Sequence, residues 1–299
     1  MKRNTFILAG LFVILLIIAF LVLQKPGEQS VTSVSAGLLF TVDSISVDKL
    51  EIRTPAFSLV LEKRGIEWFV AQPVNYKADQ ANIGKIIHQI KNLEIKNIVS
   101  NKPEKQSVFQ VDQTGTQVTV YEKGTEKASF ILGKMAASYS ESYVRRLNSN
   151  DVFIIEGASS YLFNRPIKDW RDKTILTTPK ENIKEVRYQY GDTTFNITFS
   201  DSAWFAGKDK AQQSVAEGIL SSLSNLQADD FIDSTVSPKL TAMITYAGTQ
   251  LRFSFDKIVN KYYVQSSGSS QWFVLEPWKA NQILKRKKEI VEVSKKIVR

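Results

Sequence analysis

The chain has 299 residues, no cysteine and a single histidine, which excludes disulfides, thiolate metal sites, thiol nucleophiles and metal sites with two histidine ligands within it. Its formal charge is +9, but residues 1–25 carry +3 and residues 279–299 carry +6, so residues 26–278 have no net charge. Nucleic-acid binding depends on a basic surface that neutralises phosphates, and residues 26–278 have no net positive charge. We therefore expect no nucleic-acid partner.

The first predicted element is a membrane helix. Residues 6–23 are 18 consecutive positions without a charged or strongly polar side chain. As a helix, this run would extend roughly 27 Å, close to the thickness of a bilayer's hydrocarbon core. Lys2 and Arg3 favour a cytoplasmic N-terminus. We therefore expect a single-pass protein of the inner (cytoplasmic) membrane with an extracytoplasmic, periplasmic body. The anchor residues would include Phe6, Leu11, Leu16, Phe20 and Leu23.

A cleaved signal peptide is the alternative interpretation of the same segment. The nearest small-residue site, Val34-Ser35-Ala36, lies well beyond the apolar run. The run is also longer than the usual signal-peptide core of roughly 7–15 residues. We therefore favour an uncleaved signal anchor over residues 1–24, followed by a flexible spacer over residues 25–36.

A first module is predicted over residues 37–157. It begins with three strands, because apolar residues alternate in three short runs: Leu50 and Ile52; Phe57, Leu59 and Leu61; Ile66, Trp68 and Val70. Asp79 can cap a following helix, whose apolar face would hold Ile83, Ile86, Ile87, Ile90 and Leu93. Hairpins are expected from there to residue 156.

The apolar pattern of this module recurs later in the chain. Leu50, Ile52, Trp68, Ile83, Ile87 and Ile90 fall, at an offset of 136, on Val186, Tyr188, Trp204, Ile219, Leu223 and Leu226. Tyr143, Val144, Phe153, Ile155 and Glu156 match Tyr263, Val264, Phe273, Leu275 and Glu276 at an offset of 120. Ser214 and Glu217 form a capping-box pattern for the second helix.

These patterns predict an α+β fold: a transmembrane helix followed by two tandem duplicated modules, each a mostly antiparallel sheet with one packed helix. The second module would span residues 183–299 and end in a basic C-terminal helix, with residues 158–182 as a linker. That last helix, with Lys285-Arg286-Lys287-Lys288, could contact anionic lipid or simply be solvated, and we favour solvation.

Titratable residues give weak candidates for chemistry. His88 has no partner in the pattern and is interpreted as a surface residue. Asp229, Asp230 and Asp233 could in principle bind a hard cation, but their spacing is not that of a known calcium loop, and solvated charges at a strand are favoured. We expect no enzyme activity, no catalytic, metal or cofactor-binding residue and no cofactor. An enzyme that uses two facing carboxylates, as in glycoside hydrolysis, is kept as a third hypothesis.

Aromatic residues give candidates for binding. The repeated pairs Trp68/Trp204 and Phe153/Phe273 could form a sugar-stacking surface, but core positions are favoured. Partner contact is possible at Trp170, Arg171, Asp172, Lys173 and Trp278. A local ion-paired turn is the favoured alternative for residues 170–173.

Several short motifs in order resemble one bacterial family over nearly the whole chain. They are Trp68-Phe69-Val70 before Pro73, Ala78-Asp79-Gln80, Leu132-Gly133-Lys134, Tyr143-Val144-Arg145 and Trp170-Arg171-Asp172-Lys173. With the N-terminal membrane helix, they resemble the bacterial domain of unknown function 4340 family. The segment Val108–Asp112 departs from the Phe-Gly-Leu-Asp type of turn expected there.

The resemblance implies a role in transport. Members of that family are commonly encoded beside an ATP-binding cassette ATPase, an ABC-2-type permease and a gliding-motility-type auxiliary membrane protein. We therefore expect a non-enzymatic, membrane-anchored accessory subunit of such a system, with the permease, its ATPase and other envelope proteins as partners. The alternative is an envelope-tethered module that binds glycan or lipid without a transporter.

Overall fold

The computed structural model describes residues 12–15, 37–138, 140–156 and 160–291, which form two compact units divided between Arg171 and Asp172. The spacer predicted over residues 25–36 lies outside the described residues. So do the predicted anchor residues Phe6, Leu11, Leu16, Phe20 and Leu23. Among the described residues, no helix has both the length and the apolar character needed to cross a membrane.

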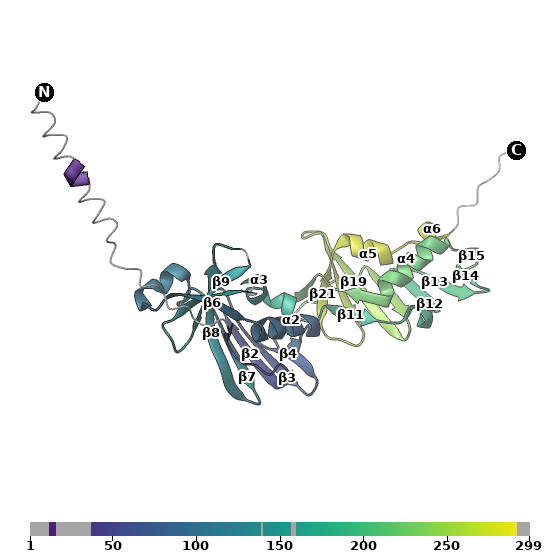
Figure 1. Ribbon diagram of the computed structural model, residues 1–299. Coiled ribbons are helices and arrows are strands. Elements are labelled where there is room, and N and C mark those ends of the chain that lie inside the picture. The colour runs from purple at the N-terminus through teal and green to yellow at the C-terminus, as the bar shows by residue number, and fades with distance from the viewer. Residues whose placement is uncertain (1–11, 16–36, 139, 157–159, 292–299) are drawn as a thin grey trace, which may run out of the picture. The chain divides into compact units, whose positions relative to one another are not determined.

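Unit 1 is an antiparallel sheet of ten strands with one long helix on its face (Figure 1). The strands are β1 (Gly37–Leu38), β2 (Val47–Arg53), β3 (Ser58–Arg64), β4 (Glu67–Gln72), β5 (Tyr76–Lys77), β6 (Glu94–Ser100), β7 (Thr116–Glu122), β8 (Thr125–Met135), β9 (Glu141–Arg146) and β10 (Val152–Glu156). Their order in the sheet is β1-β6-β10-β9-β8-β7-β2-β3-β4-β5. The helical elements are α2 (Gln80–Lys91), η1 (Pro103–Lys105), η2 (Ser107–Phe109), α3 (Ser160–Phe163) and η3 (Ile167–Trp170).

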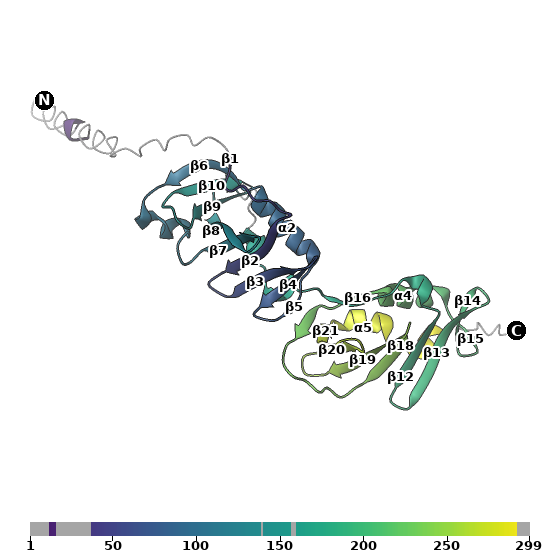
Figure 2. The same ribbon diagram turned by 90° about the horizontal axis from the view of Figure 1, so that it is seen from below.

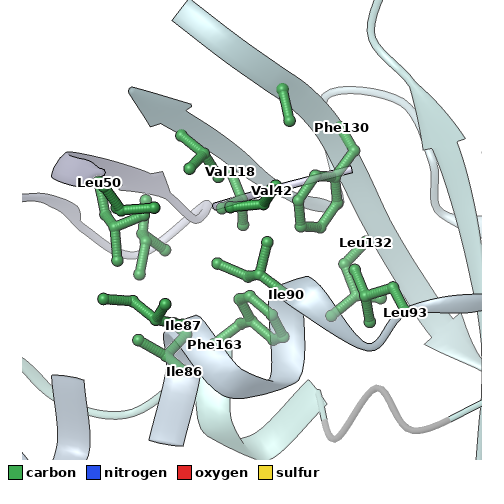
Figure 3. Packing of buried hydrophobic residues seen from close by; sticks show 14 of the residues in the cluster. Val42, Leu50, Ile86, Ile87, Ile90, Leu93, Val118, Phe130, Leu132 and Phe163 are labelled. Carbon is green, nitrogen blue, oxygen red and sulfur yellow. The ribbon is translucent and has the colours of Figure 1, made fainter. Parts of the chain in front are cut away.

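The core of unit 1 lies between α2 and the sheet. Ile83, Ile86, Ile87 and Ile90 are the buried residues of α2, and this helical spacing puts them on one face. Figure 3 shows three of these isoleucines directed toward residues from the strands and toward Phe163 of α3. Burying one such side chain fully contributes about 1.5–3 kcal/mol, so the apolar face of α2 fixes the helix on the sheet.

Unit 2 contains a nine-stranded antiparallel sheet, a two-stranded sheet and three helices (Figure 2). Its strands are β11 (Thr174–Thr177), β12 (Glu185–Tyr190), β13 (Thr193–Ser200), β14 (Ala203–Ala206), β15 (Asp209–Lys210), β16 (Asn225–Gln227), β17 (Asp230–Ile232), β18 (Ala242–Tyr246), β19 (Thr249–Asp256), β20 (Lys261–Ser266) and β21 (Trp272–Leu275). The helical elements are η4 (Lys180–Asn182), α4 (Gln213–Ser224), α5 (Pro277–Ile283) and α6 (Lys287–Ile290).

The two large sheets have the same strand order. In unit 2 the order is β17-β21-β20-β19-β18-β12-β13-β14-β15, and in unit 1 β6-β10-β9-β8-β7-β2-β3-β4-β5 occupy the same successive places. In each unit the long helix follows the last of the short edge strands, β5 or β15. A residue in one unit can therefore be matched to a residue in the other by its strand pairing.

The mostly antiparallel α+β architecture predicted from the sequence is confirmed. Ile66 differs from the prediction, because it lies in the turn before β4 and is 92% exposed, whereas Trp68 and Val70 are buried. The boundaries also differ. Residues 160–171 belong to unit 1, and residues 172–182 belong to unit 2, where β11 pairs with β16. The predicted linker is therefore divided between the units.

One predicted helix feature of unit 2 is wrong. The capping box Ser214–Glu217 does not form, because α4 begins at Gln213 with Gln212 as its N-cap, which places Ser214 inside the first turn. Of the predicted basic C-terminal helix, the described residues contain α6, and an interruption at residues 284–286 separates α6 from α5. Residues 292–299 lie outside the described residues. The interruption is stabilised by tertiary contacts, since the N–H of Gln212 donates to the carbonyl of Ile290 at 2.8 Å.

Candidate functional sites

Residues of the family-like motifs meet at the start of α2, where they form a group that we call the helix clamp: Trp68, Ala78, Asp79, Gln80 and Trp170. The N–H of Asp79 donates to the carbonyl of Trp170 at 2.8 Å, and the carboxylate of Asp79 caps α2 by accepting from Asn82. Gln80 joins the helix to β4, because its side-chain amide both accepts from the Trp68 N–H and donates to the Trp68 carbonyl, each at 3.0 Å. The polar groups of these motifs therefore stabilise unit 1.

Trp170, a predicted partner contact, is a core residue. Its side chain is 0% exposed, and its indole Nε1 donates to the carbonyl of Arg165 at 3.3 Å. The guanidinium of Arg165 lies 5.6 Å from the centre of the indole ring. Because the indole is enclosed by its own unit, it offers no surface to a partner.

The next three motif residues have different environments. Arg171 is 3% exposed, and its guanidinium lies 4.5 Å from the ring centre of Tyr76. In unit 2, the Asp172 carboxylate accepts from the Thr174 N–H at 2.9 Å. The Lys173 carbonyl accepts from the Ala228 N–H at 2.8 Å. The Asp172 carboxylate therefore forms a local turn with the backbone, while the ion pair expected in residues 170–173 stays a prediction.

Trp278, on α5, is the one of these five residues with a largely exposed side chain. It is 60% exposed, and the ammonium of Lys279 lies 5.6 Å from its ring centre. An exposed indole beside a cation can contact a flat or anionic surface. Trp278 therefore remains a predicted contact residue.

The remaining motifs lie under a segment that we call the outer cover, residues 103–111. Phe109 and Val111 of this segment pack against Ile131, Tyr143 and Val152 of the sheet. Ile131 alternates with Phe130 and Leu132 of the α2-facing core, so the outer cover lies on the opposite face of the sheet. The outer cover thus gives unit 1 a second, smaller apolar cluster.

Gly133, in the Leu132-Gly133-Lys134 motif, lies directly beneath the outer cover. A Cβ atom at this position would be 2.2 Å from the carbonyl oxygen of Phe109 and 2.8 Å from Cγ1 of Val111. Only glycine allows this close approach. The neighbouring Gln110 has a left-handed φ of 56°, and it occupies the place of glycine in the Phe-Gly-Leu-Asp type of turn.

Arg145, the last residue of the Tyr143-Val144-Arg145 motif, also holds the outer cover. Its guanidinium donates to the carbonyls of Val111 at 2.9 Å, Leu147 at 3.0 Å and Ser149 at 3.0 Å. Burial lowers the pKa of Arg145 below its ordinary value, with the Asp112 carboxylate acting in the opposite direction. Arg145 is therefore a structural residue with its donors directed at the backbone.

The other polar candidates take part in local contacts. His88 is exposed on α2, and its Nε2 lies 3.1 Å from Nδ2 of Asn92. The Asp229 carboxylate pairs with the ammonium of Lys279 at 2.6 Å and accepts from the Glu276 N–H at 2.8 Å. The Asp230 carboxylate accepts from the N–H of Phe231 at 2.9 Å, while Asp233 is exposed. Within the described residues no group of three or more metal-ligating side chains is found.

The repeated aromatic residues are core residues, as the favoured interpretation predicted. The exposed fractions are 7% for Trp68, 3% for Trp204, 3% for Phe153 and 2% for Phe273. Their rings are therefore inaccessible to a stacked sugar.

Unit 2 contains a cavity of about 560 Å³ that the sequence patterns did not indicate. It is lined by Tyr190, Thr241, Ala242, Phe255, Tyr262, Asn281, Leu284, Lys285, Arg286 and Glu289. The size lies within the range of small-molecule sites, about 300–1,000 Å³. We call it the unit 2 cavity.

One wall of the unit 2 cavity combines an aromatic ring with a cation. The guanidinium of Arg286 lies 3.7 Å from the ring centre of Tyr190, and the Tyr190 hydroxyl donates to the carbonyl of Lys285 at 2.9 Å. Burial raises the pKa of Tyr190 well above its ordinary value, which keeps this hydroxyl protonated. The Glu289 carboxylate is held at the backbone, where it accepts from the Arg286 N–H at 2.8 Å.

The sequence contained one usable signal for this cavity. Phe255 pairs with Tyr262 across β19 and β20, whereas the corresponding pair of β8 and β9 is Met135 with Ser142. A search for positions where the second apolar pattern gains aromatic residues could have found Phe255 and Tyr262. The basic wall could not be found in this way, because its approach to Tyr190 depends on the path of the chain after α5.

Comparison of the chain with curated proteins and with solved structures gave no match. A family match covers residues 68–242 and is described as Domain of unknown function (DUF4340). It begins in β4 of unit 1 and ends in β18 of unit 2, so it includes the helix clamp, Gly133 and Arg145. The match covers more than half of the chain, and the chain therefore belongs to the family described as Domain of unknown function (DUF4340).

Proposed function

We propose that the two units are copies of one duplicated module. Their shared strand order supports this, as do residue pairs that match by position. Lys63 pairs with Trp68 in unit 1, and Phe199 pairs with Trp204 in unit 2, at an offset of 136. Phe153 pairs with Val144 and Phe273 with Val264, at an offset of 120.

The offset in the helix is 133 rather than 136. α2 begins at Gln80 and α4 at Gln213, and their buried residues, Ile83, Ile86, Ile87 and Ile90 against Ala216, Ile219, Leu220 and Leu223, agree with that offset. The isolated bridges Ala78–Arg171 and Ala211–Val291 also place β5 and β15 at 133. Five residues separate the paired Val70 and Tyr76, whereas two separate the corresponding pair Ala206 and Asp209, so the chain is three residues shorter there in unit 2.

The 120 offset continues to the end of each unit. It matches Phe163 to Ile283 and Trp170 to Ile290, and each of these side chains is 0% exposed. The carbonyl of Trp170 accepts from Asp79, and that of Ile290 accepts from Gln212. The proposed module therefore runs through residue 171 in the first copy and through residue 291 in the second.

We further propose that the protein is a non-enzymatic, membrane-anchored accessory subunit of an ABC-2-type, gliding-motility-like transport system, with its two units outside the cytoplasm. The observation that carries this proposal is the uncharged run of residues 6–23 behind Lys2 and Arg3, directly before the two units. The proposal gives Asp79, Gln80 and Arg145 a structural role, because their side chains are engaged in internal hydrogen bonds.

Affinity purification tests the partnership. The full chain, tagged at its C-terminus, is crosslinked in intact cells, extracted in mild detergent and analysed by mass spectrometry. A permease and its ATPase should be recovered. In a control chain, residues 6–23 are replaced by an unrelated single-pass helix; loss of the permease in that control would place the contact in the membrane. Recovery of the protein alone, with crosslinker and without, would refute the proposal.

Protease protection tests the topology independently. Protease added to intact spheroplasts should digest both units, while a cytoplasmic marker protein stays intact. Units that survive until the cells are lysed would place the body inside and refute the extracytoplasmic location. An N-terminus found beyond Ala36 in the mature protein would favour the cleaved signal peptide.

The second candidate function is an envelope-tethered module that binds glycan or lipid. The exposed indole of Trp278 beside Lys279 favours it. The full chain in detergent should then bind cell-wall or lipid fractions, and Trp278→Ala should weaken that binding several-fold. Equal binding by both chains would remove this candidate.

A further inference from the structure

The unit 2 cavity contains two cations at its wall. The ammonium of Lys285 and the guanidinium of Arg286 have no carboxylate partner among the described residues, in contrast to Lys287, which pairs with Asp209 at 2.8 Å. A guanidinium stacked on a ring has a fixed plane, and its edge still presents N–H donors. Such a group suits the two-oxygen contact of a carboxylate or phosphate.

The cavity also contains flat apolar surface. The rings of Phe255 and Tyr262 lie with their centres 4.8 Å apart, at an interplanar angle of 44°. Both side chains are partly exposed where they line the cavity. Asn281 and Thr241 add polar groups to the lining. The cavity therefore combines aromatic surface with polar and charged groups.

At the corresponding place in unit 1, a hydrogen bond joins two segments of the chain. Thr116 Oγ1 donates to Asn164 Oδ1 at 2.7 Å, and this bond joins β7 to the end of α3. By strand pairing Thr116 corresponds to Ala242, and by the 120 offset Asn164 corresponds to Leu284. Both unit 2 residues line the cavity and cannot form that bond. This hydrogen bond is therefore specific to unit 1.

We propose that the unit 2 cavity binds a small organic anion, in which a carboxylate or phosphate is joined to a flat apolar group. Arg286 and Lys285 bind the oxyanion, and Phe255 and Tyr262 contact the flat group. Glu289 is the one carboxylate at the wall, and it opposes anion binding. This inference does not depend on the transport role, since it rests on unit 2 alone.

The test is calorimetric titration of the full chain in nonionic detergent with two probes, phenyl phosphate and 3-phenylpropionate. Inorganic phosphate serves as the oxyanion alone and benzyl alcohol as the flat group alone. Phenyl phosphate, phenylpropionate or both should bind more tightly than either fragment, and the better probe shows whether phosphate or carboxylate is the preferred head. Binding of neither probe at millimolar concentration would overturn the proposal. So would inorganic phosphate that binds as tightly as the better probe.

Matched variants locate the site. Arg286→Gln should weaken the better probe about tenfold or more, because it removes charge-assisted hydrogen bonds. Lys288→Gln removes the same charge from an exposed neighbour outside the cavity lining, and it should change the affinity less than about twofold. Equal loss in both variants would indicate binding by net charge and overturn the assigned site.

Two further variants are expected to change the affinity for the probes in opposite directions. Glu289→Gln should strengthen binding, since it removes the opposing charge while the amide oxygen can still accept from the backbone of Arg286. Phe255→Met introduces the residue of unit 1 and should weaken both probes without changing the affinity for inorganic phosphate. Unchanged affinity in both variants would overturn the assigned roles.

Discussion

Unit 1 and unit 2 complete a common strand order in different ways. Unit 1 carries the outer cover, held by Arg145, and closes the end of its sheet with the Thr116–Asn164 hydrogen bond. Unit 2 has Gln265 in place of Arg145 and an open cavity in place of that bond. The apolar framework is therefore shared, whereas polar and aromatic residues give each unit its own surface.

The largest expected effect on one unit and not the other comes from removal of the buried indole of Trp170. Trp170→Ala should cost unit 1 about 3–5 kcal/mol of unfolding free energy, because it leaves a large cavity beside α2. Hydrogen exchange of the full chain should show lost protection in α2 and unchanged protection in α4. Trp278→Ala is the matched control and should stay within about 0.5 kcal/mol. Unchanged protection of α2 would contradict the place of Trp170 in unit 1.

The next largest effect is expected at the outer cover. Arg145→Met leaves three backbone carbonyls without their donor and should cost about 1–3 kcal/mol of local stability. The amide of Val111, which donates to the carbonyl of Gln106, should exchange faster. Gln265→Met, at the corresponding place in unit 2, should have a smaller effect, since it removes one bond to Ser270. Equal effects would show that the outer cover does not depend on Arg145.

A smaller difference is expected at the two helix starts. Asp79→Ala removes the cap on the N–H of Asn82 and should cost about 0.5–2 kcal/mol. α4 has no side-chain cap, and Gln212 instead donates from Nε2 to the carbonyl of Val291. Gln212→Ala should therefore release Val291 with little change in the first turn of α4. Backbone amide exchange of the two helices measures both effects.

The smallest effect concerns an exposed charge network. Lys96 pairs with Glu141 at 2.8 Å and with Glu156 at 3.0 Å. Hydrogen bonds to these carboxylates raise the pKa of Lys96 above its ordinary value of 10.5. Because the folded state holds this proton more tightly, the stabilisation is complete below pH 10.5 and is lost as the pH rises through the folded-state pKa. The measurement is the unfolding free energy as a function of alkaline pH. The Lys96→Met chain should not show the loss of stability that the natural chain shows in this range. Identical pH profiles of the two chains would contradict the role given to the Lys96 pairs.

The sequence predicted the strands and helices well, because burial imposes regular periods on apolar residues. β2, β3 and α2 follow directly from those periods. The same regularity concealed the true helix offset, since a shift of three residues on a helix brings one apolar position onto another. Ile83 therefore matched Ile219 in the sequence, whereas it corresponds to Ala216 in the structure.

What could not be predicted depends on contacts between distant segments. The sequence around Trp170 indicates an aromatic residue beside charges, but its side chain belongs to the apolar core of unit 1. Its carbonyl accepts from the N–H of Asp79, 91 positions earlier. The cavity likewise requires Arg286 to meet Tyr190, which lies on another element. Apolar alternation and helical spacing describe residues that are close in the sequence, so they contain no information on contacts between distant segments.

Two of the three charges in the Lys96 charge network of unit 1 have the opposite sign in unit 2. Asp229, Lys261 and Glu276 occupy the places of Lys96, Glu141 and Glu156, and they form the pairs Lys261–Glu276 and Asp229–Lys279. Adjacent copies of one module can exchange strands during folding. Here, β6 inserted into the second copy would bring Lys96 near Lys261, and the reverse exchange would bring Asp229 near two glutamates. We therefore expect the reversed charges to oppose misassembly between the copies. Refolding yields of a Lys96→Asp/Glu141→Lys chain should be lower than those of the natural sequence, and equal yields would exclude this role.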